Sequence, residues 1–201
     1  MVKQYARGKL ADLGCGEKPY KEMVADFVEL HVGIDHPDSL HDKSQIDLIG
    51  SAYRLPVKDE MFDSVLCTYV LEHLEEPHRA IAEAHRILKK GGCGIYTVPF
   101  FWHLHEAPRD FFRFTKYGLK YLFESNGFEI LELRALSGFC VTFGQEFAYF
   151  LNQFRGRRRI NPLYWLVPPL ITLILVIAYV LSKIEKSEDF TIEYIIVVRK
   201  K

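Results

Sequence analysis

The sequence predicts an α/β protein built on a parallel, doubly wound sheet. Short apolar runs alternate with helix-like segments at a spacing of roughly 20 residues along the 201-residue chain. The first run ends in two glycines, Gly14 and Gly16, and the second ends in an acidic residue, Asp35. Ligands of such sheets bind beyond the carboxyl ends of the strands. We therefore expect function to lie in the residues that follow the strands.

Seven segments fit strands because they are short and apolar, or alternate apolar with polar side chains. They are residues 9–13, 32–36, 45–50, 62–70, 94–100, 127–136 and 190–200. Three segments between them carry apolar side chains at helical spacing. They are residues 17–31, 77–92 and 115–126. Pro77 and Gly91 mark the ends of the second helix, and Thr115 and Gly127 mark those of the third.

Charge and cysteine usage narrow the class of protein. The chain has 26 Lys and Arg against 26 Asp and Glu, so its formal net charge of zero gives no general attraction to nucleic acid. Its four cysteines form no C-x-x-C pair, which argues against a zinc knuckle or a thioredoxin-like site. They are Cys15, Cys67, Cys93 and Cys140. The sequence therefore predicts reduced thiols in a cytosolic protein, and its N-terminus lacks the apolar run of a signal peptide.

The glycine loop has two interpretations. Glycines between a strand and a helix allow a sharp turn and the close approach of a ligand, but they also occur in plain turns. The dinucleotide-binding motif has a third glycine where this chain has Pro19, and this difference argues against a nicotinamide cofactor. Asp35 lies 19 residues after Gly16, where an acidic side chain can accept hydrogen bonds from ribose hydroxyls. The two features together favour a nucleoside-containing cofactor.

Several motifs in order resemble class I S-adenosylmethionine-dependent methyltransferases of the type 11-like group. They are D-L-G-C-G (12–16), G-S-A-Y-R-L-P-V-K-D-E-M-F-D-S-V (50–65), Y-V-L-E-H-L-E-E-P (69–77) and E-A-H-R-I-L-K-K-G-G (83–92). The resemblance covers about residues 8–136 and the last strand. It implies a Rossmann-like seven-stranded sheet with the last strand antiparallel, and S-adenosyl-L-methionine as the cofactor.

The resemblance also implies which residues bind the cofactor. Asp12 would anchor the loop near the methionine amino group, the glycine loop would pass under the methionine part, and Asp35 would hold the ribose. The family usually has Asp where this chain has Ser51, so we expect a weaker contact to the adenine amino group. The predicted cofactor residues are Asp12, Gly14, Cys15, Gly16, Asp35, His36, Ser51, Ala52 and Thr68.

Two places offer groups for the acceptor. His73 follows the fourth strand, and residues 103–115 follow the fifth with a dense set of polar and aromatic side chains. This loop resembles the H-x-x-P-x-D-x-x-R-x-T pattern of methyltransferases of bacterial envelope polysaccharide synthesis. We expect His105 to act as base or acceptor-orienting residue, Arg113 to clamp an anionic group and Asp110 to orient Arg113. A solvated loop is the alternative, and a metal site from His103, His105 and Glu106 is disfavoured.

Residues 160–182 carry no charge and follow a basic stretch of Arg155, Arg157, Arg158 and Arg159. The length suits a membrane span, but Pro168 and Pro169 would leave a helix of only 13 residues, about 20 Å against a bilayer core of about 30 Å. A single pass would also put the last strand on the wrong side of the membrane. We therefore expect a monotopic or re-entrant helix over 163–182. A single span, or a helical subdomain or dimer interface in a soluble protein, is the alternative.

These observations predict a methyltransferase domain over 1–136 and 190–201 and a hydrophobic helical insertion over 137–189. The short segment before the first strand suggests an open pocket that suits an acceptor presented by a membrane. We expect O-methylation of a lipid-linked saccharide or another membrane-presented or small-molecule acceptor at the cytoplasmic face of a membrane, with no nucleic acid as partner. The alternatives are a cytoplasmic location, a non-catalytic membrane adaptor and a nicotinamide-dependent oxidoreductase.

Overall fold

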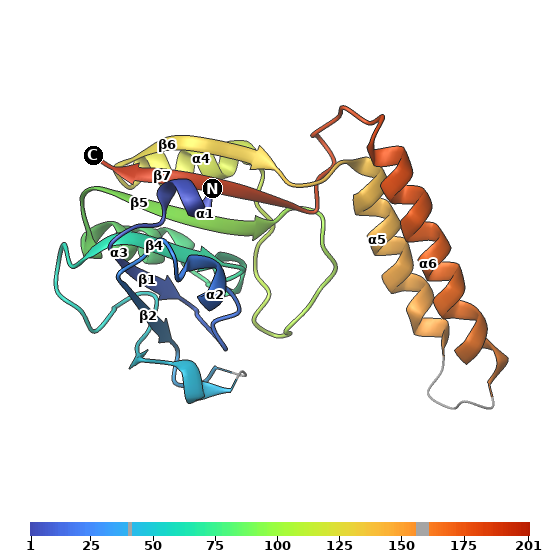
Figure 1. Ribbon diagram of the computed structural model, residues 1–201, viewed down its shortest axis with the longest axis horizontal. Coiled ribbons are helices and arrows are strands. Elements are labelled where there is room, and N and C mark those ends of the chain that lie inside the picture. Colours follow the sequence, from blue (N-terminus) through green and yellow to red (C-terminus); the bar gives the residue numbers. More distant parts are fainter. Residues whose placement is uncertain (40–41, 156–160) are drawn as a thin grey trace. The chain divides into compact units, whose positions relative to one another are not determined.

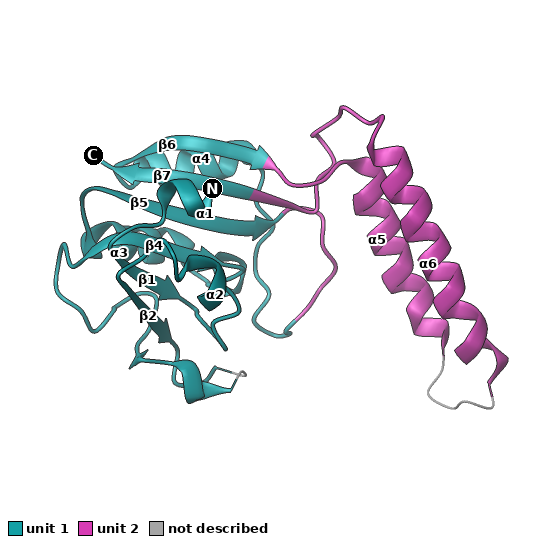
Figure 2. Ribbon diagram, viewed as in Figure 1, with its two compact units in different colours: residues 1–99, 106–134, 195–201 teal, residues 100–105, 135–194 magenta. Residues whose placement is uncertain are grey.

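The computed structural model describes residues 1–39, 42–155 and 161–201. The chain divides into two compact units, shown in Figure 2. The first comprises residues 1–99, 106–134 and 195–201, and the second comprises residues 100–105 and 135–194.

A seven-stranded sheet forms the centre of the first unit, in the order β3-β2-β1-β4-β5-β7-β6 (Figure 1). The strands are β1 (Lys9–Leu13), β2 (Leu30–Asp35), β3 (Leu48–Ile49), β4 (Phe62–Thr68), β5 (Leu88–Pro99), β6 (Phe128–Ala135) and β7 (Glu193–Lys200). Neighbouring strands from β3 to β5 pair in parallel, whereas β7 is antiparallel. The predicted α/β class and the antiparallel last strand are therefore confirmed.

Helices cover both faces of this sheet. They are α1 (Val2–Tyr5), α2 (Lys21–Val24), α3 (Pro77–Ile87) and α4 (Lys116–Ser125), and three-residue 3₁₀ turns stand at η1 (Lys43–Gln45) and η2 (Leu71–His73). Leu10, Leu66 and Ile95 of the central strands pack in one buried cluster with Val24 of α2. The ring of Phe123 of α4 packs 4.7 Å from that of Tyr96 of β5. Burial on both faces explains why β1 and β4 are apolar almost throughout.

The end of α3 is a correction to the sequence prediction. The helix stops at Ile87, and the segment L-K-K-G-G expected as its last turn begins β5 instead. Leu88 is fully buried opposite Phe62 of β4, and a register shift follows before the next pairs. Gly91 takes a left-handed conformation, with φ of 75°, within this irregular stretch. Pairing with β4 thus outweighs the glycine as a helix signal.

The segment expected as a helix over 17–31 is helical only at α2, and β3 is shorter than residues 45–50. The third helix follows the prediction closely. The hydroxyl of Thr115 accepts a hydrogen bond from the amide of Gly118 at 3.0 Å, which caps α4, and Gly127 follows with φ of 83°.

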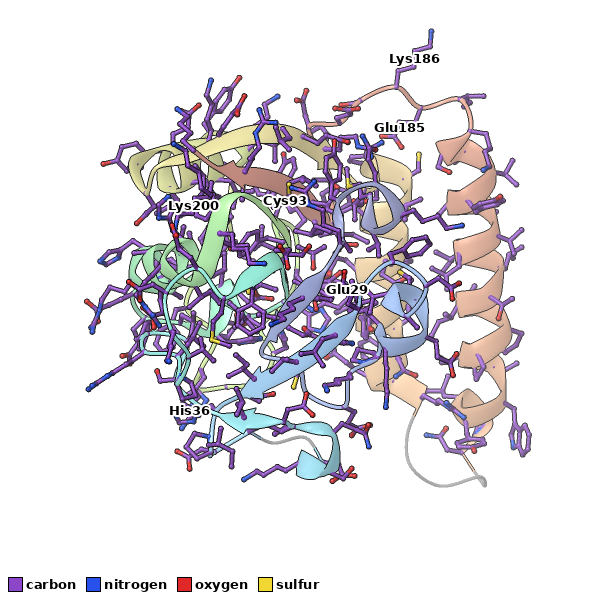
Figure 3. All side chains as sticks on the ribbon, turned by 60° about the vertical axis from the view of Figure 1, so that its left-hand side comes forward. Glu29, His36, Cys93, Glu185, Lys186 and Lys200 are labelled. Carbon is purple, nitrogen blue, oxygen red and sulfur yellow. The ribbon has the colours of Figure 1, made fainter. Side chains whose placement is uncertain are left out.

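The second unit is dominated by two helices, α5 (Phe139–Asn152) and α6 (Pro162–Ser182), with the turn η3 (Gln153–Arg155) after α5. A Cβ on Gly144 of α5 would stand 2.6 Å from that of Ala178 of α6, so glycine permits this close approach. The carboxylate of Glu185 accepts hydrogen bonds from the amides of Phe139 and Cys140 at 2.5 and 2.9 Å. This caps the first turn of α5, and Figure 3 labels Glu185 beside it.

Helix α6 corrects the expectation that Pro168 and Pro169 would shorten it. The helix runs through both prolines for 21 residues, about 31 Å. Proline removes an amide donor, but its φ is compatible with a helix. The hydroxyl of Thr172 bonds the carbonyl of Pro168 at 3.0 Å, and packing on α5 supports the following turns. The argument from a short helix is therefore wrong, whereas the position of the insertion between β6 and β7 is as expected.

Candidate active site

The glycine loop after β1 has the backbone of a ligand cradle. Gly14 and Gly16 both take left-handed conformations, with φ of 67° and 48°, which favour glycine. The amide of Gly14 donates to the carbonyl of Ile34 at 2.8 Å. A Cβ on Gly14 would stand 2.3 Å from the side chain of Val70, so the segment after β4 lies directly on the loop.

Asp35 ties the end of β2 to this loop. One carboxylate oxygen accepts the amide of Gly16 at 2.8 Å, and the other accepts the amide of His36 at 2.6 Å. Each oxygen keeps lone-pair capacity for a further donor, such as a ribose hydroxyl. His36 itself is exposed at the end of the strand, where Figure 3 labels it. Asp35 therefore positions the loop and remains able to bind a nucleoside.

Buried polar groups support the loop from below. Asp12 is 2% exposed and its carboxylate lies 2.8 Å from Nε2 of His31, a partner that sequence analysis did not identify. The ammonium of Lys18 lies 2.5 Å from the carboxylate of Asp47. Burial, followed by the nearby charge of Asp12, raises the pKa of Cys15 to about 12, so this thiol is unreactive near neutral pH.

Ser51 and Ala52, expected at the edge of the adenine, follow β3, and Thr68, expected at the floor of the pocket, ends β4. Ser51 forms an isolated bridge with Arg54, and its hydroxyl accepts the amide of Tyr53 at 3.2 Å. Ala52 follows Ser51 in this turn. Thr68 is half-buried at the end of β4, opposite Thr97 of β5. The roles of all three toward the cofactor remain predictions.

Residues 106–114 fold over the segment that follows β4. The backbone carbonyl of Glu72 accepts the amides of Phe111 and Phe112 at 2.9 and 3.2 Å. His73 adds a side-chain contact, since its Nδ1 lies 2.5 Å from the carbonyl of Arg109. These bonds hold the loop at the carboxyl end of β4.

The predicted acceptor residues are divided between the units. In the first unit, Asp110 accepts two N–H groups of Arg113 at 2.6 and 2.8 Å, a bidentate pair in which the Asp110 side chain is 2% exposed. His73 belongs to the same unit. His105 belongs to the second unit, as does its neighbour His103, whose Nδ1 lies 3.4 Å from Glu146.

Sequence analysis missed Glu72. Its side chain is fully buried, and neither carboxylate oxygen has a hydrogen-bond partner within residues 1–39, 42–155 and 161–201. Burial raises the pKa of Glu72 to about 8. Glutamate is seldom fully buried, so the sequence L-E-H-L predicts an exposed side chain. Its position directly after a strand was the one sequence feature that pointed to the site.

These residues fit S-adenosyl-L-methionine. The two left-handed glycines allow the tight turn after β1 and the close packing of Val70 on Gly14, and Asp35 offers acceptors for a ribose. Glu72, two residues after Val70, is a buried carboxyl without a hydrogen-bond partner among the described residues. Asp12 and the loop would hold the methionine part, and Asp35 the ribose.

Comparisons with known proteins agree with this fit. Residues 11–96 match the family model described as "Methyltransferase domain". A tRNA (carboxymethyluridine(34)-5-O)-methyltransferase of Arabidopsis thaliana is 33% identical over 94 residues, which are 44% of this chain and 23% of that protein. The chain spans less than half the length of the curated relatives it matches.

Solved structures share the fold at lower identity. A SAM-dependent methyltransferase from Archaeoglobus fulgidus has a TM-score of 0.61 at 14% identity, covering 98% of this chain and 88% of that one. The [4+2]-cyclase SpnF also has a TM-score of 0.61, at 22% identity, covering 99% and 78%. Residues 11–96 therefore match a methyltransferase domain, and the comparisons support a class I S-adenosylmethionine-dependent methyltransferase, a family whose cofactor is S-adenosyl-L-methionine.

Proposed function

We propose that the chain is an S-adenosylmethionine-dependent O-methyltransferase that acts on an acceptor presented at a membrane surface. The observation that supports the cofactor half is the 2.8 Å hydrogen bond from the Gly16 amide to the carboxylate of Asp35, which joins the glycine loop to the proposed ribose-binding residue. The observation that carries the membrane half is the apolar surface of α6.

The cofactor supplies a methyl group that its sulfonium already activates. The protein then has to align a nucleophile and, for a hydroxyl, to remove its proton. His73 follows β4 and contacts the backbone carbonyl of Arg109 in the loop over residues 106–114, and it is one candidate base. His105 is the other candidate base.

Arg113 is the proposed clamp for an anionic acceptor such as a phosphate-bearing lipid. Its guanidinium already holds Asp110 through two hydrogen bonds, so its orientation is fixed before an acceptor binds. A third hydrogen bond, from Nη1 of Arg113 to the backbone carbonyl of Phe112 at 2.9 Å, fixes the same guanidinium further.

The second unit supports a membrane location. Among the described residues, α6 is the one helix long and apolar enough to cross a membrane, with a mean hydropathy of 2.2. A core helix of a soluble protein meets the same test, but such a helix is mostly buried, whereas this one is 11% buried. Its exposed apolar side chains are Leu163, Trp165, Leu166, Leu170, Leu173, Val176, Ile177, Val180 and Leu181.

Topology favours insertion from one side. The insertion leaves β6 and returns to β7, which are neighbours in one sheet, so both of its ends meet the same face of a membrane. We propose a monotopic or re-entrant arrangement at the cytoplasmic face. Arg155 before α6 and Lys183 after it can meet anionic headgroups. The other arginines of the basic stretch, Arg157, Arg158 and Arg159, lie outside the described residues.

Two binding measurements test this function. Calorimetry should detect S-adenosylhomocysteine binding and no NAD binding, whereas NAD binding would favour an oxidoreductase. Flotation with phosphatidylglycerol vesicles should bring the protein to the lipid layer, with weaker recovery on phosphatidylcholine alone. Vesicle binding without S-adenosylhomocysteine binding would indicate a non-catalytic adaptor, and the reverse result would remove the membrane from the proposal.

A further inference from the structure

Glu72 is a buried acid that the predicted catalytic set does not use. It lies in η2, directly after β4, and is 0% exposed. Neither carboxylate oxygen finds a donor in the described part of the chain. A buried carboxyl without partners is costly, and the cost is larger when it carries a charge. A bound ligand that pairs with the carboxyl would remove this cost.

The segment that carries this carboxyl lies against the glycine loop. Val70, two residues earlier, lies against Gly14, the first glycine of the loop. The charges of Glu72 and of Asp12 both act on the thiol of Cys67 in β4 and, after burial, raise its pKa. Asp12 precedes the glycines on β1. Asp12 and Glu72 therefore stand at or just after the carboxyl ends of two adjacent strands, β1 and β4.

We propose that the carboxylate of Glu72 is the counter-charge of the cofactor's sulfonium. The proposal rests on the proposed function, since it requires that the loop bind S-adenosyl-L-methionine. A fixed positive charge is the chemistry that stabilises an unpaired buried carboxylate, and the cofactor carries one where its product, S-adenosylhomocysteine, has a neutral sulfur. Glu72 thereby discriminates cofactor from product.

Charged groups around Glu72 do not already fill this role. The backbone amide of Glu72 and then the charge of Arg113 lower the pKa of Glu72, but the Arg113 guanidinium is committed to Asp110. The imidazole of His73 lies within 4.8 Å of the Glu72 carboxylate, and its Nδ1 is held at the backbone carbonyl of Arg109. Asp110 and Glu106 from the loop act in the opposite direction. From the sheet side, Asp12 and the Cys67 thiol add no positive charge.

This environment determines whether protons are released or taken up when the cofactor binds. With a pKa of about 8, Glu72 is mostly protonated at pH 7 in the free protein. An opposite charge within a few ångströms lowers a carboxyl pKa by about 1–3 units. Binding of S-adenosyl-L-methionine at pH 7 should therefore release roughly half a proton or more per site. Binding of S-adenosylhomocysteine should release much less.

Titration calorimetry of the full chain in two buffers of different ionisation enthalpy measures this difference. Both ligands carry the same amino acid group, so its protonation cancels in the comparison. Greater release with S-adenosyl-L-methionine than with S-adenosylhomocysteine is the expected result. Equal release with both ligands overturns the proposal while leaving cofactor binding intact. If neither ligand binds, the proposed function and this inference fail together.

Two substitutions test whether Glu72 is the group that releases the proton. Glu72→Gln keeps the shape and removes the charge, so it should weaken S-adenosyl-L-methionine about tenfold or more, leave S-adenosylhomocysteine within about twofold and abolish the differential proton release. Glu76→Gln is the matched control, since its side chain is 47% exposed four residues later. Unchanged preference and proton release in Glu72→Gln would contradict the proposal. If Glu72→Gln does not fold, the two-ligand comparison on the unaltered chain still decides.

Discussion

Strand β4 and helix α6 are both rich in leucine, valine and isoleucine, yet they expose them differently. Leu66 of β4 is 3% exposed, with neighbouring strands on both sides and a helix layer on each face of the sheet. Leu173 of α6 is 56% exposed, although α6 packs along α5. Apolar composition therefore predicts that a surface is shielded from water, but it does not show whether protein or lipid shields it. In β4 the chain itself supplies the cover, whereas in α6 we propose that lipid does.

The same substitution in β4 and in α6 should have very different effects on stability. Leu66→Ala should lower the free energy of unfolding by about 2–5 kcal/mol, because it leaves a cavity in the core. Leu173→Ala should change it by no more than about 0.5 kcal/mol in the absence of lipid. Urea unfolding of the two variants measures both values. A large loss in Leu173→Ala would mean that α6 is covered by protein in solution, as in a dimer.

The cofactor loop gives the next largest effect. Asp35→Asn cannot accept both the Gly16 and the His36 amides in the native geometry, because one of its oxygens becomes a donor group. The affinity for S-adenosylhomocysteine should fall about tenfold or more. Asp38→Asn, at a side chain that is 68% exposed, is the control and should bind like the unaltered chain. Equal affinities in the two variants would remove Asp35 from the site.

The third prediction concerns pH. The folded protein holds the Glu72 proton more tightly than the unfolded chain, because burial raises its pKa from 4.5 to about 8. This contribution to stability is complete below pH 4.5 and is lost as the pH rises toward 8. The melting temperature of the ligand-free protein should therefore carry a downward component over that range, of about 10 °C, that Glu72→Gln lacks. Parallel pH profiles in the two proteins would contradict the assigned burial.

The smallest effect is expected at the start of α5. Hydrogen bonds from Cys140 and Phe139 lower the pKa of Glu185, so its stabilisation is present above pH 4.5 and is lost as the pH falls through the lowered value. Glu185→Gln should speed hydrogen exchange of the first-turn amides at pH 7 and have no effect at strongly acidic pH. Glu188→Gln serves as the control. Exchange rates that match at both pH values would mean that the cap does not form.

The sequence predicted those parts of the fold in which local pattern and tertiary environment agree. The strand at residues 9–13 was predicted to the residue, because an apolar run between polar flanks is also what a central strand requires. The end of α3 was not predicted correctly. Gly91 taken alone indicates the end of a helix, but beside β4 it lies in an irregular part of a strand. The prolines of α6 show the same limit, since packing on α5 is invisible to a local rule.

The candidate site divides in the same way. The left-handed glycines and Asp35 could be predicted because a turn and a strand end fix their positions relative to one another. Glu72 could not, because its burial depends on residues 111 and 112 returning to its carbonyl from 39 and 40 positions away. Long-range closure of this kind leaves no periodic trace in the sequence.

Methyl transfer to a membrane-borne acceptor can be measured with a labelled cofactor. The full chain would be incubated with methyl-labelled S-adenosyl-L-methionine and a total membrane extract, and the label would be followed into the organic-soluble fraction. We expect label in a lipid-soluble product with the unaltered chain, and at least tenfold less with Asp35→Asn under subsaturating cofactor. Label confined to water-soluble molecules, or equal labelling by both proteins, would contradict this expectation.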